Sequence, residues 1–322
     1  MTKPRDHGGN LDAAIARFGG SRADWLDLST GINPVPYPVG DIPAEAWTAL
    51  PDRAASDRLI RAARAFWTVP DDAAIVAAPG ASAIIAHLPR ILGAPQKVSI
   101  NRPTYNEWAA SFEQAGWEAP TSGPTGAVGI HVHPNNPDGI YSPPPPESFD
   151  RPPQPDDPFL IYDESFCDPD LEMSTVRHAG SGRLAVVKSF GKFWGLAGVR
   201  LGFLIGPQDL IDDMTALLGP WPASGPALEI GARALEDKAW TAATIARLAT
   251  DHRRLDELMK RAGAAETTGT DLFRLYTVDN AAAWQDRLAK HHVWSRIFPY
   301  NDKWLRLGLP HPDRWDQLES AL

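Results

Sequence analysis

Short apolar runs of strand-forming residues recur in the middle of the chain, between residues 73 and 206. Turn signals or helical patterns separate them, which is typical of a mostly parallel sheet with helices on both faces. The pattern therefore predicts an α/β domain. The six predicted strands cover residues 73–78, 97–100, 128–133, 159–163, 185–188 and 200–205.

Two helical patterns connect the first three of these predicted strands. Residues 81–92 are rich in Ala, Ile and Leu, and residues 106–116 place Trp108 and Phe112 one turn apart on the same face. We expect both segments to be crossover helices. Residues 138–158 are crowded with proline, which removes a backbone donor and interrupts helices, so this segment is expected to be a surface connection.

The pattern changes in the last third of the chain. Residues 225–262 form one long, alanine-rich helical pattern that Gly263 ends. Strand patterns at 272–278 and 304–309 and a helical pattern near 281–291 follow. We predict a small α+β domain there. The expected division is a large domain over residues 30–235 and a small, substrate-closing domain built from residues 1–29 and 236–322.

The densest chemical signal follows the fifth predicted strand. Ser189, Lys192 and Arg200 place a hydroxyl, an amine and a guanidinium within twelve residues of glycine-rich sequence. An amine in a partly desolvated pocket near another cation can add to a carbonyl, and the hydroxyl and guanidinium can bind a phosphate. A glycine-rich loop with solvated charges is the alternative. The Ser-x-x-Lys pattern of penicillin-recognising enzymes lacks its companion motifs here.

Three further motifs stand at the ends of predicted strands, where open α/β sheets bind their ligands. Gly80, Ala81 and Ser82 join a strand to a helix, so their backbone N–H groups could bind an anion. Residues 135–139 form an Asn/Pro/Gly turn, and Asp163 ends an apolar strand. A buried acid needs a cationic partner, and a pyridinium nitrogen is one. Each motif alone could also be an ordinary turn or strand end.

Together these motifs resemble the fold-type-I pyridoxal-phosphate enzymes of the class I and II aminotransferase family. The likeness covers nearly the whole chain and implies pyridoxal 5'-phosphate as cofactor, a homodimer, and a large domain whose mostly parallel, seven-stranded sheet lies between helices. A small α+β domain accompanies it. The residues that carry the resemblance are Asn136, Pro137, Gly139, Asp163, Ser189, Lys192 and Arg200.

The resemblance also implies a role for each residue. Lys192 would hold the cofactor as a Schiff base, Asp163 would keep the ring nitrogen protonated, and Tyr105 would stack on the ring face; these three are the expected catalytic residues. Asn136 would bind the phenolic oxygen of the ring. The expected cofactor-binding set is Gly80, Ala81, Ser82, Tyr105, Asn136, Asp163, Ser189, Lys192 and Arg200.

Two subfamilies fit this pattern: the threonine-phosphate decarboxylases of cobalamin biosynthesis and the histidinol-phosphate aminotransferases. The opening His-Gly-Gly-Asn sequence resembles the decarboxylases, whose first segment folds over the substrate, and Phe166 stands where the aminotransferases carry tyrosine. We expect decarboxylation of O-phospho-L-threonine, with transamination as the alternative. The expected substrate-binding residues are His7, Gly8, Gly9, Asn10, Asn33 and Arg306, the last at the family's carboxylate-binding arginine.

Some positions depart from the family pattern. Leu50 replaces a tyrosine that contacts the cofactor phosphate of the partner subunit, and His133 replaces an asparagine. A flexible tail is the alternative interpretation of the His-Gly-Gly sequence. His131 and His133 could be read as a metal pair, but no third ligand with suitable spacing accompanies them, so no metal is expected.

Composition and charge narrow the choice of partners. The net charge of −9 argues against nucleic acid, and the polar start without a long apolar stretch leads us to expect a cytoplasmic protein with no membrane partner. Cys167 is the single cysteine, so no internal disulfide can form. A ligand-sensing transcription factor would need a basic DNA-binding domain, which this sequence lacks. A small phosphorylated amino acid is the expected substrate.

Overall fold

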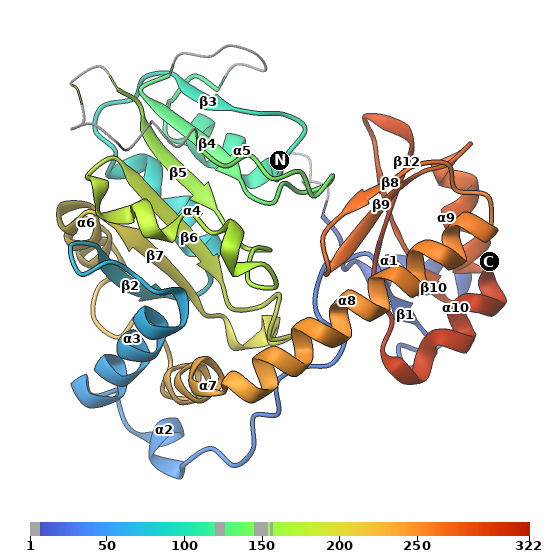
Figure 1. The fold of residues 1–322 in the computed structure, drawn as a ribbon, viewed down its shortest axis with the longest axis horizontal. Helices are drawn as coiled ribbons and strands as arrows, with labels where there is room; N and C mark the ends of the chain where they lie inside the picture. Colours follow the sequence, from blue (N-terminus) through green and yellow to red (C-terminus); the bar gives the residue numbers. More distant parts are fainter. Residues whose placement is uncertain (1–6, 120–125, 145–153, 155–156) are drawn as a thin grey trace. The chain divides into compact units, whose positions relative to one another are not determined.

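The computed structural model describes residues 7–119, 126–144, 154 and 157–322 (Figure 1). The chain divides into two compact units, and the divisions at 36/37 and 241/242 fall a few residues after the predicted boundaries at 29/30 and 235/236. The large unit comprises Tyr37–Asn136 and Tyr141–Thr241. The small unit comprises Met1–Pro36, Pro137–Ile140 and Ala242–Leu322. Much of the proline-rich connection predicted over residues 138–158 lies outside the described residues.

A twisted, mostly parallel sheet forms the centre of the large unit. Its strands are almost completely apolar and buried on both faces, as expected for parallel strands covered by helices. The four strands β3 to β6 run parallel, and β7 runs antiparallel to both of its neighbours, which confirms the predicted α/β class. In spatial order the strands are β2 (Ala74–Ala78), β7 (Gly202–Gly206), β6 (Leu184–Ser189), β5 (Phe159–Asp163), β4 (Val128–Val132) and β3 (Val98–Ile100).

The described residues give this sheet six strands instead of the seven expected. Beyond β3, the described part of the edge continues as a parallel bridge between Lys97 and Glu118. The Glu118 carbonyl accepts the Val98 N–H at 2.9 Å, and the Glu118 N–H donates to the Gln96 carbonyl at 2.9 Å.

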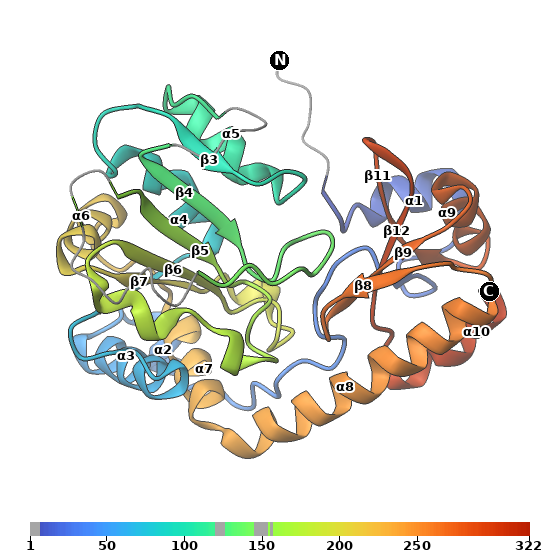
Figure 2. The same ribbon diagram turned by 45° about the horizontal axis from the view of Figure 1, so that its top comes forward.

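Helices cover both faces of the sheet, as Figure 2 also shows. On one face, α4 (Ala81–His87), α5 (Asn106–Gln114) and α6 (Gln208–Leu218) share a core with the strands, and Trp108 and Phe112 are fully buried in it, on the predicted face of α5. On the other face, α3 (Arg53–Trp67) contacts β2 and packs against α7 (Gly225–Glu236). The short helix α2 (Ala44–Thr48) also contacts α7.

The long helical pattern over residues 225–262 is two helices, not one. The chain leaves α7 at Asp237 and begins α8 (Lys238–Arg261) directly afterwards. The Asp237 side chain accepts the Trp240 N–H at 2.9 Å, and its carbonyl accepts the Thr241 N–H at 3.1 Å. Aspartate is among the preferred N-cap residues, so the break has a local cause in the sequence.

The small unit has the predicted α+β character. Strands β11 (Arg296–Phe298), β12 (Asn301–Gly308), β9 (Phe273–Thr277) and β8 (Thr267–Gly269) form an antiparallel sheet in that order. A separate parallel pair joins β1 (Leu26–Asp27) to β10 (Val293–Trp294). The helices are α1 (Leu11–Phe18), α9 (Ala281–Ala289) and α10 (Trp315–Ala321).

Short 3₁₀ helices complete the described structure. In chain order they are Leu88–Arg90, Leu171–Met173, Val176–Ser181, Ala197–Val199 and Pro312–Arg314. Across the described ranges, none of the helices combines the length and the apolar character that crossing a membrane requires.

Candidate active site

A pocket lies at the carboxyl ends of β4, β5 and β6, within the large unit. Parallel strands end at the same edge of a sheet, so side chains that follow different strands meet there. Gly80 directly precedes the first pocket residue. The other predicted cofactor-binding residues all line the pocket: Ala81, Ser82, Tyr105, Asn136, Asp163, Ser189, Lys192 and Arg200.

Lys192 reaches this pocket from the loop after β6. Its Nζ lies 5.2 Å from the centre of the Phe166 ring, which also lines the pocket. Lys188 lies four residues earlier, on β6, in a different environment. It is fully buried, and its Nζ lies 2.7 Å from Glu164 Oε2 and 3.3 Å from Asp168 Oδ1. Of these two lysines, only Lys192 can present its amine to a ligand in the pocket.

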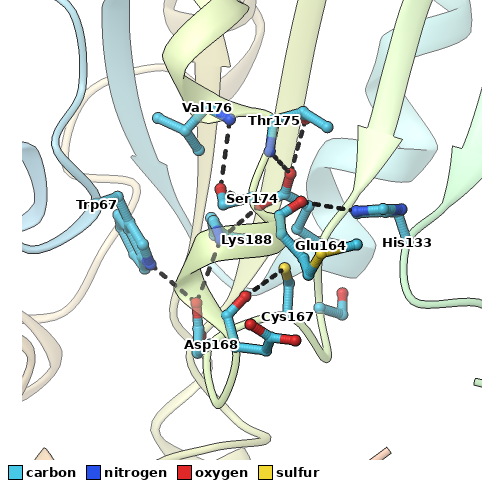
Figure 3. Close-up of polar contacts among 12 residues, drawn as sticks. Trp67, His133, Glu164, Cys167, Asp168, Ser174, Thr175, Val176 and Lys188 are labelled. Carbon is cyan, nitrogen blue, oxygen red and sulfur yellow. Dashed lines mark hydrogen bonds and ion pairs between the residues drawn. The ribbon is translucent and has the colours of Figure 1, made fainter. Parts of the chain in front are cut away.

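Figure 3 shows the buried network around Lys188. Burial alone would lower the pKa of the Lys188 ammonium, but the carboxylates of Glu164 and Asp168 outweigh burial and raise that pKa. For the Glu164 carboxyl, burial alone would raise the pKa, but the positive charge of Lys188 holds this pKa below its usual value. Lys188 therefore stays a cation, and removing one partner of such a pair costs about 3–5 kcal/mol.

Hydrogen bonds satisfy the remaining oxygens of Glu164 in the same network. Glu164 Oε2 accepts the Ser174 hydroxyl at 2.6 Å, and Glu164 Oε1 accepts the Thr175 N–H at 2.6 Å and its hydroxyl at 2.7 Å. Trp67 Nε1–H donates to Asp168 Oδ1 at 2.9 Å. Glu164 follows Asp163 and Lys188 precedes Ser189, so this network fixes the backbone directly beside two pocket residues.

Asp163 is the buried acid at the end of β5, and both of its carboxylate oxygens accept hydrogen bonds. Oδ2 accepts the Trp108 Nε1–H at 2.8 Å, and Oδ1 accepts the Ser165 hydroxyl at 2.5 Å and the Ser165 N–H at 3.0 Å. Burial raises the pKa of the Asp163 carboxyl, and the hydrogen bonds from Ser165 and Trp108 oppose that rise. A desolvated carboxylate facing a pocket calls for a cationic ligand group.

The expected phosphate-binding residues also lie together. Ser189 pairs in the sheet with Gly202, which pairs on its other side with Ala78, two residues before Gly80. Arg200 holds a left-handed backbone with φ of 56°, which is uncommon for a residue other than glycine. Gly80 has a positive φ of 87°, and a Cβ there would lie 2.5 Å from the Arg200 guanidinium, so glycine suits both the backbone conformation and the close approach.

Tyr105 and Asn136 come from two loops that hydrogen bonds join. The Thr104 hydroxyl donates to Asn135 Oδ1 at 2.6 Å, and Asn135 Nδ2–H donates to the Pro103 carbonyl at 3.1 Å. Tyr105 immediately precedes α5, and Asn136 follows β4. The loops thus hold an aromatic ring and an amide at the same pocket.

These residues fit pyridoxal phosphate by their chemistry. An amine at Lys192, an acid at Asp163 and an aromatic ring at Tyr105 match an aldehyde, a ring nitrogen and a ring face. Ser189 and Arg200 supply a hydroxyl and a cation for a phosphate. At Gly80 the backbone itself approaches the guanidinium.

Other polar residues near the pocket have structural contacts. His133 is buried; its Nδ1 accepts the Ser142 N–H at 2.9 Å, and its Nε2 lies 2.8 Å from the Met173 carbonyl oxygen. Both ring nitrogens are therefore used by the backbone, which leaves none for a metal. Cys167 is buried, and burial raises the pKa of its thiol.

The expected substrate-binding residues belong to the small unit, and several meet at Ser29. The Gly9 N–H donates to Ser29 Oγ at 2.7 Å, and Arg306 Nη2–H donates to the Ser29 carbonyl at 2.8 Å. A Cβ on Gly8 would overlap the same carbonyl. His7 is exposed. The structure thus brings the Gly8–Gly9 segment and Arg306 to one short stretch of chain.

Asn10 and Asn33 have backbone contacts of their own. Asn10 is the N-cap of α1, where its side chain accepts the Ala13 N–H at 3.4 Å. Asn33 is buried, and its Oδ1 accepts the Val35 N–H at 3.0 Å and a hydrogen bond from Arg247. Arg247 also pairs with an acid one turn along α8, so it holds Asn33 in a fixed orientation.

Arg306 is a buried cation on β12. Burial, reinforced by the neighbouring Arg296 guanidinium, lowers the pKa of Arg306 from its usual value. A buried guanidinium that donates to a neutral carbonyl gains strongly from an anionic partner, because the anion offsets its desolvation.

Sequence reasoning missed several of these contacts. It took Trp108 only as an apolar side chain, although a buried indole N–H needs an acceptor and Asp163 is one. It did not connect Lys188 with Glu164, whose positions beside Ser189 and Asp163 were the available signal. No role was predicted for Ser29 itself, and only the structure shows that it joins Gly9 to Arg306.

The chain is similar to known proteins over nearly its full length. Residues 160–319 match the family model of class I and II aminotransferases. The chain is 38% identical over 317 residues to a threonine-phosphate decarboxylase of Sinorhizobium sp., covering 96% of this chain and 94% of that protein. It is 35% identical over 327 residues to a threonine-phosphate decarboxylase of Pseudomonas aeruginosa, covering 98% and 97%.

A likeness to solved structures agrees with the fold. The histidinol-phosphate aminotransferase from Sinorhizobium meliloti in complex with pyridoxal-5'-phosphate has a TM-score of 0.80 to this chain, covering 98% of this chain and 94% of that one. The two sequences are 15% identical, so this likeness concerns the fold.

Proposed function

Because the chain belongs to the threonine-phosphate decarboxylase family within the class I and II aminotransferases, we propose that it removes carbon dioxide from O-phospho-L-threonine. The product is (R)-1-amino-2-propanol O-2-phosphate, an intermediate of cobalamin biosynthesis. The observation that carries the proposal is the similarity to two threonine-phosphate decarboxylases along almost the entire chain. The histidinol-phosphate aminotransferase of the same fold is far less similar in sequence.

The proposed cofactor is pyridoxal phosphate, held by the large-unit pocket. When bound, it supplies an aldehyde that amines attack and a ring that takes up the electron pair of a bond broken at Cα. Asp163 would keep a proton on the ring nitrogen, and Tyr105 would offer its side chain to the ring. Ser189 and Arg200 bind the phosphate, together with the backbone at Gly80 to Ser82.

Lys192 and Arg306 act on the substrate in this proposal. Arg306 binds the carboxylate and orients the bond between Cα and the carboxyl carbon, so that this bond breaks while the Cα hydrogen stays. Lys192 Nζ delivers a proton to Cα after carbon dioxide leaves. Phe166 replaces the tyrosine of the aminotransferases and brings no hydroxyl to the pocket beside Lys192.

Arg306→Gln is expected to raise the KM for O-phospho-L-threonine about 10- to 100-fold, because a hydrogen-bonded charge pair to the substrate carboxylate is lost. Inhibition by the reaction product should change little, since the product has no carboxylate. Steady-state kinetics with product inhibition measure both quantities. Arg274→Gln is the control, because Arg274 lies in the same sheet but pairs with Asp256. Equal weakening of substrate and product would contradict the role.

Heavy water distinguishes the two reactions of the family. Turnover of O-phospho-L-threonine in D₂O should give a product with one deuterium at Cα beside the retained substrate hydrogen, as read by mass spectrometry and NMR. A transaminase removes the Cα hydrogen instead and leaves a ketone. A ketone product, or an amine without deuterium, would refute decarboxylation by this route.

The protein is further proposed to be a cytoplasmic homodimer, as the family resemblance implies. The large unit exposes two big apolar side chains at and just after α2, Trp47 at 68% and Leu50 at 67%, and such surfaces are commonly covered by a partner. Analytical ultracentrifugation should give about twice the chain mass of 35.1 kDa. An active monomer at assay concentration would contradict the homodimer.

A further inference from the structure

The carboxylate of Asp163 accepts a hydrogen bond from Trp108, a residue that does not line the pocket. Trp108 lies on α5 and is fully buried, and its Nε1–H donates to Asp163 Oδ2 at 2.8 Å. Asp163 itself is only 2% exposed. The indole is therefore the group that fixes the second oxygen of this acid, while Ser165 fixes the first.

The chemistry of these donors restricts the protonation state of Asp163. An indole N–H and a backbone N–H can only donate, so Oδ2 faces the Trp108 donor and Oδ1 faces the Ser165 N–H donor. Both donors favour the ionised carboxylate, because hydrogen bonds donated to a carboxylate stabilise its charged form. The carboxylate thus accepts one hydrogen bond at Oδ2 and two at Oδ1, and Oδ2 keeps a lone pair for a further N–H.

The start of α5 also connects this support to the aromatic residue of the pocket. Tyr105 immediately precedes the helix, and its carbonyl accepts the Trp108 N–H of the backbone at 3.3 Å. One helical turn therefore carries both the ring that lines the pocket and the indole that holds the acid. A shift of this turn would move both groups together.

We propose that Trp108 is a positioning residue for the cofactor: its indole N–H holds Asp163 ionised and correctly oriented for the ring nitrogen of pyridoxal phosphate. The inference rests on the proposed cofactor and adds a residue that acts through Asp163. Removing the indole N–H should weaken the binding of only those ligands that contain a ring nitrogen. A purely structural Trp108 would affect every ligand of the pocket alike.

The chain offers a matched control in Trp117. This residue is also buried, in the same core, and its ring packs on Phe112 as the ring of Trp108 does. Its Nε1–H donates to the Pro89 carbonyl at 3.0 Å, away from Asp163. Trp117→Phe thus removes a buried indole N–H from the same region without touching the acid.

The test measures ligand affinity of the full-length protein freed of cofactor, with two probes. One is pyridoxal phosphate, and the other is its analogue in which carbon replaces the ring nitrogen. Trp108→Phe should weaken pyridoxal phosphate about 10- to 100-fold, the effect of losing a hydrogen bond to a charged group, and should change the affinity of the carbon analogue less than about threefold. Trp117→Phe should leave the ratio of the two affinities at its wild-type value.

Three results would overturn the inference. Equally weak binding of both probes by Trp108→Phe contradicts a role through Asp163, and so does binding of pyridoxal phosphate at wild-type affinity. Wild-type protein that binds neither probe would refute the cofactor itself, and with it this role. If Trp108→Phe does not fold, a tryptophan analogue with sulfur in place of the ring N–H keeps the ring shape at position 108, and the same affinity ratio decides.

Discussion

Lys192→Ala is expected to abolish the visible absorbance band of bound pyridoxal phosphate and to lower turnover by at least about 10²- to 10⁴-fold, the range for losing a positioned acid–base group. This variant lacks the amine that binds the cofactor covalently and transfers the proton. Lys188 cannot replace it, because Glu164 and Asp168 hold that amine as a buried cation. Absorbance spectra after dialysis and a turnover assay measure the two effects.

Borohydride treatment of the wild-type protein gives the matching positive result. It should fix the cofactor on the peptide that contains Lys192, as read by peptide mass spectrometry. Lys290→Ala, which removes an exposed lysine of the small unit, should keep both band and activity. A Lys192→Ala protein that retains the band, or a cofactor fixed on another lysine, would overturn the assignment.

Asp163→Asn is expected to lower turnover about 10²- to 10³-fold while cofactor remains bound, because a neutral amide does not keep the ring nitrogen protonated. Two effects on the stability of the cofactor-free protein oppose each other. Burial raises the pKa of Asp163, so an amide relieves the desolvation cost of the buried charge, but the amide NH2 must face the N–H donor of Trp108 or of Ser165. The melting temperature should therefore change by only a few degrees.

Kinetics together with thermal unfolding of the cofactor-free variant separate these effects. Turnover within about twofold of wild type would mean that the acid only ends the strand. A large fall in melting temperature would mean that the variant is misfolded, and its lost activity would then say nothing for the proposed role.

The sequence predicted the central sheet well because parallel strands, buried on both faces, appear as uninterrupted apolar runs. Each of the six predicted runs overlaps one strand of the sheet. The pocket could also be foreseen, since residues that follow parallel strands converge at one edge; Asp163, Ser189 and Lys192 lie there for that reason.

Other features depend on information that a linear pattern does not contain. The break at Asp237 depends on one N-cap inside an alanine-rich pattern, and in the described residues the seventh strand is represented by the Lys97–Glu118 bridge. The pairing of Trp108 with Asp163 joins residues far apart in the chain, through a polar atom on a side chain counted as apolar. The ion pair between Glu164 and Lys188 likewise needs two neighbouring strands to be in register.

Release of carbon dioxide without an acceptor tests the proposed function most directly. Purified protein saturated with pyridoxal phosphate is given O-phospho-L-threonine with no keto acid present, and carbon dioxide is counted per active site. We predict release that continues far beyond one equivalent, because protonation at Cα by Lys192 restores the starting state after every cycle. Release that stops within one equivalent, or amino-group exchange between histidinol phosphate and 2-oxoglutarate without any carbon dioxide, would contradict a decarboxylase.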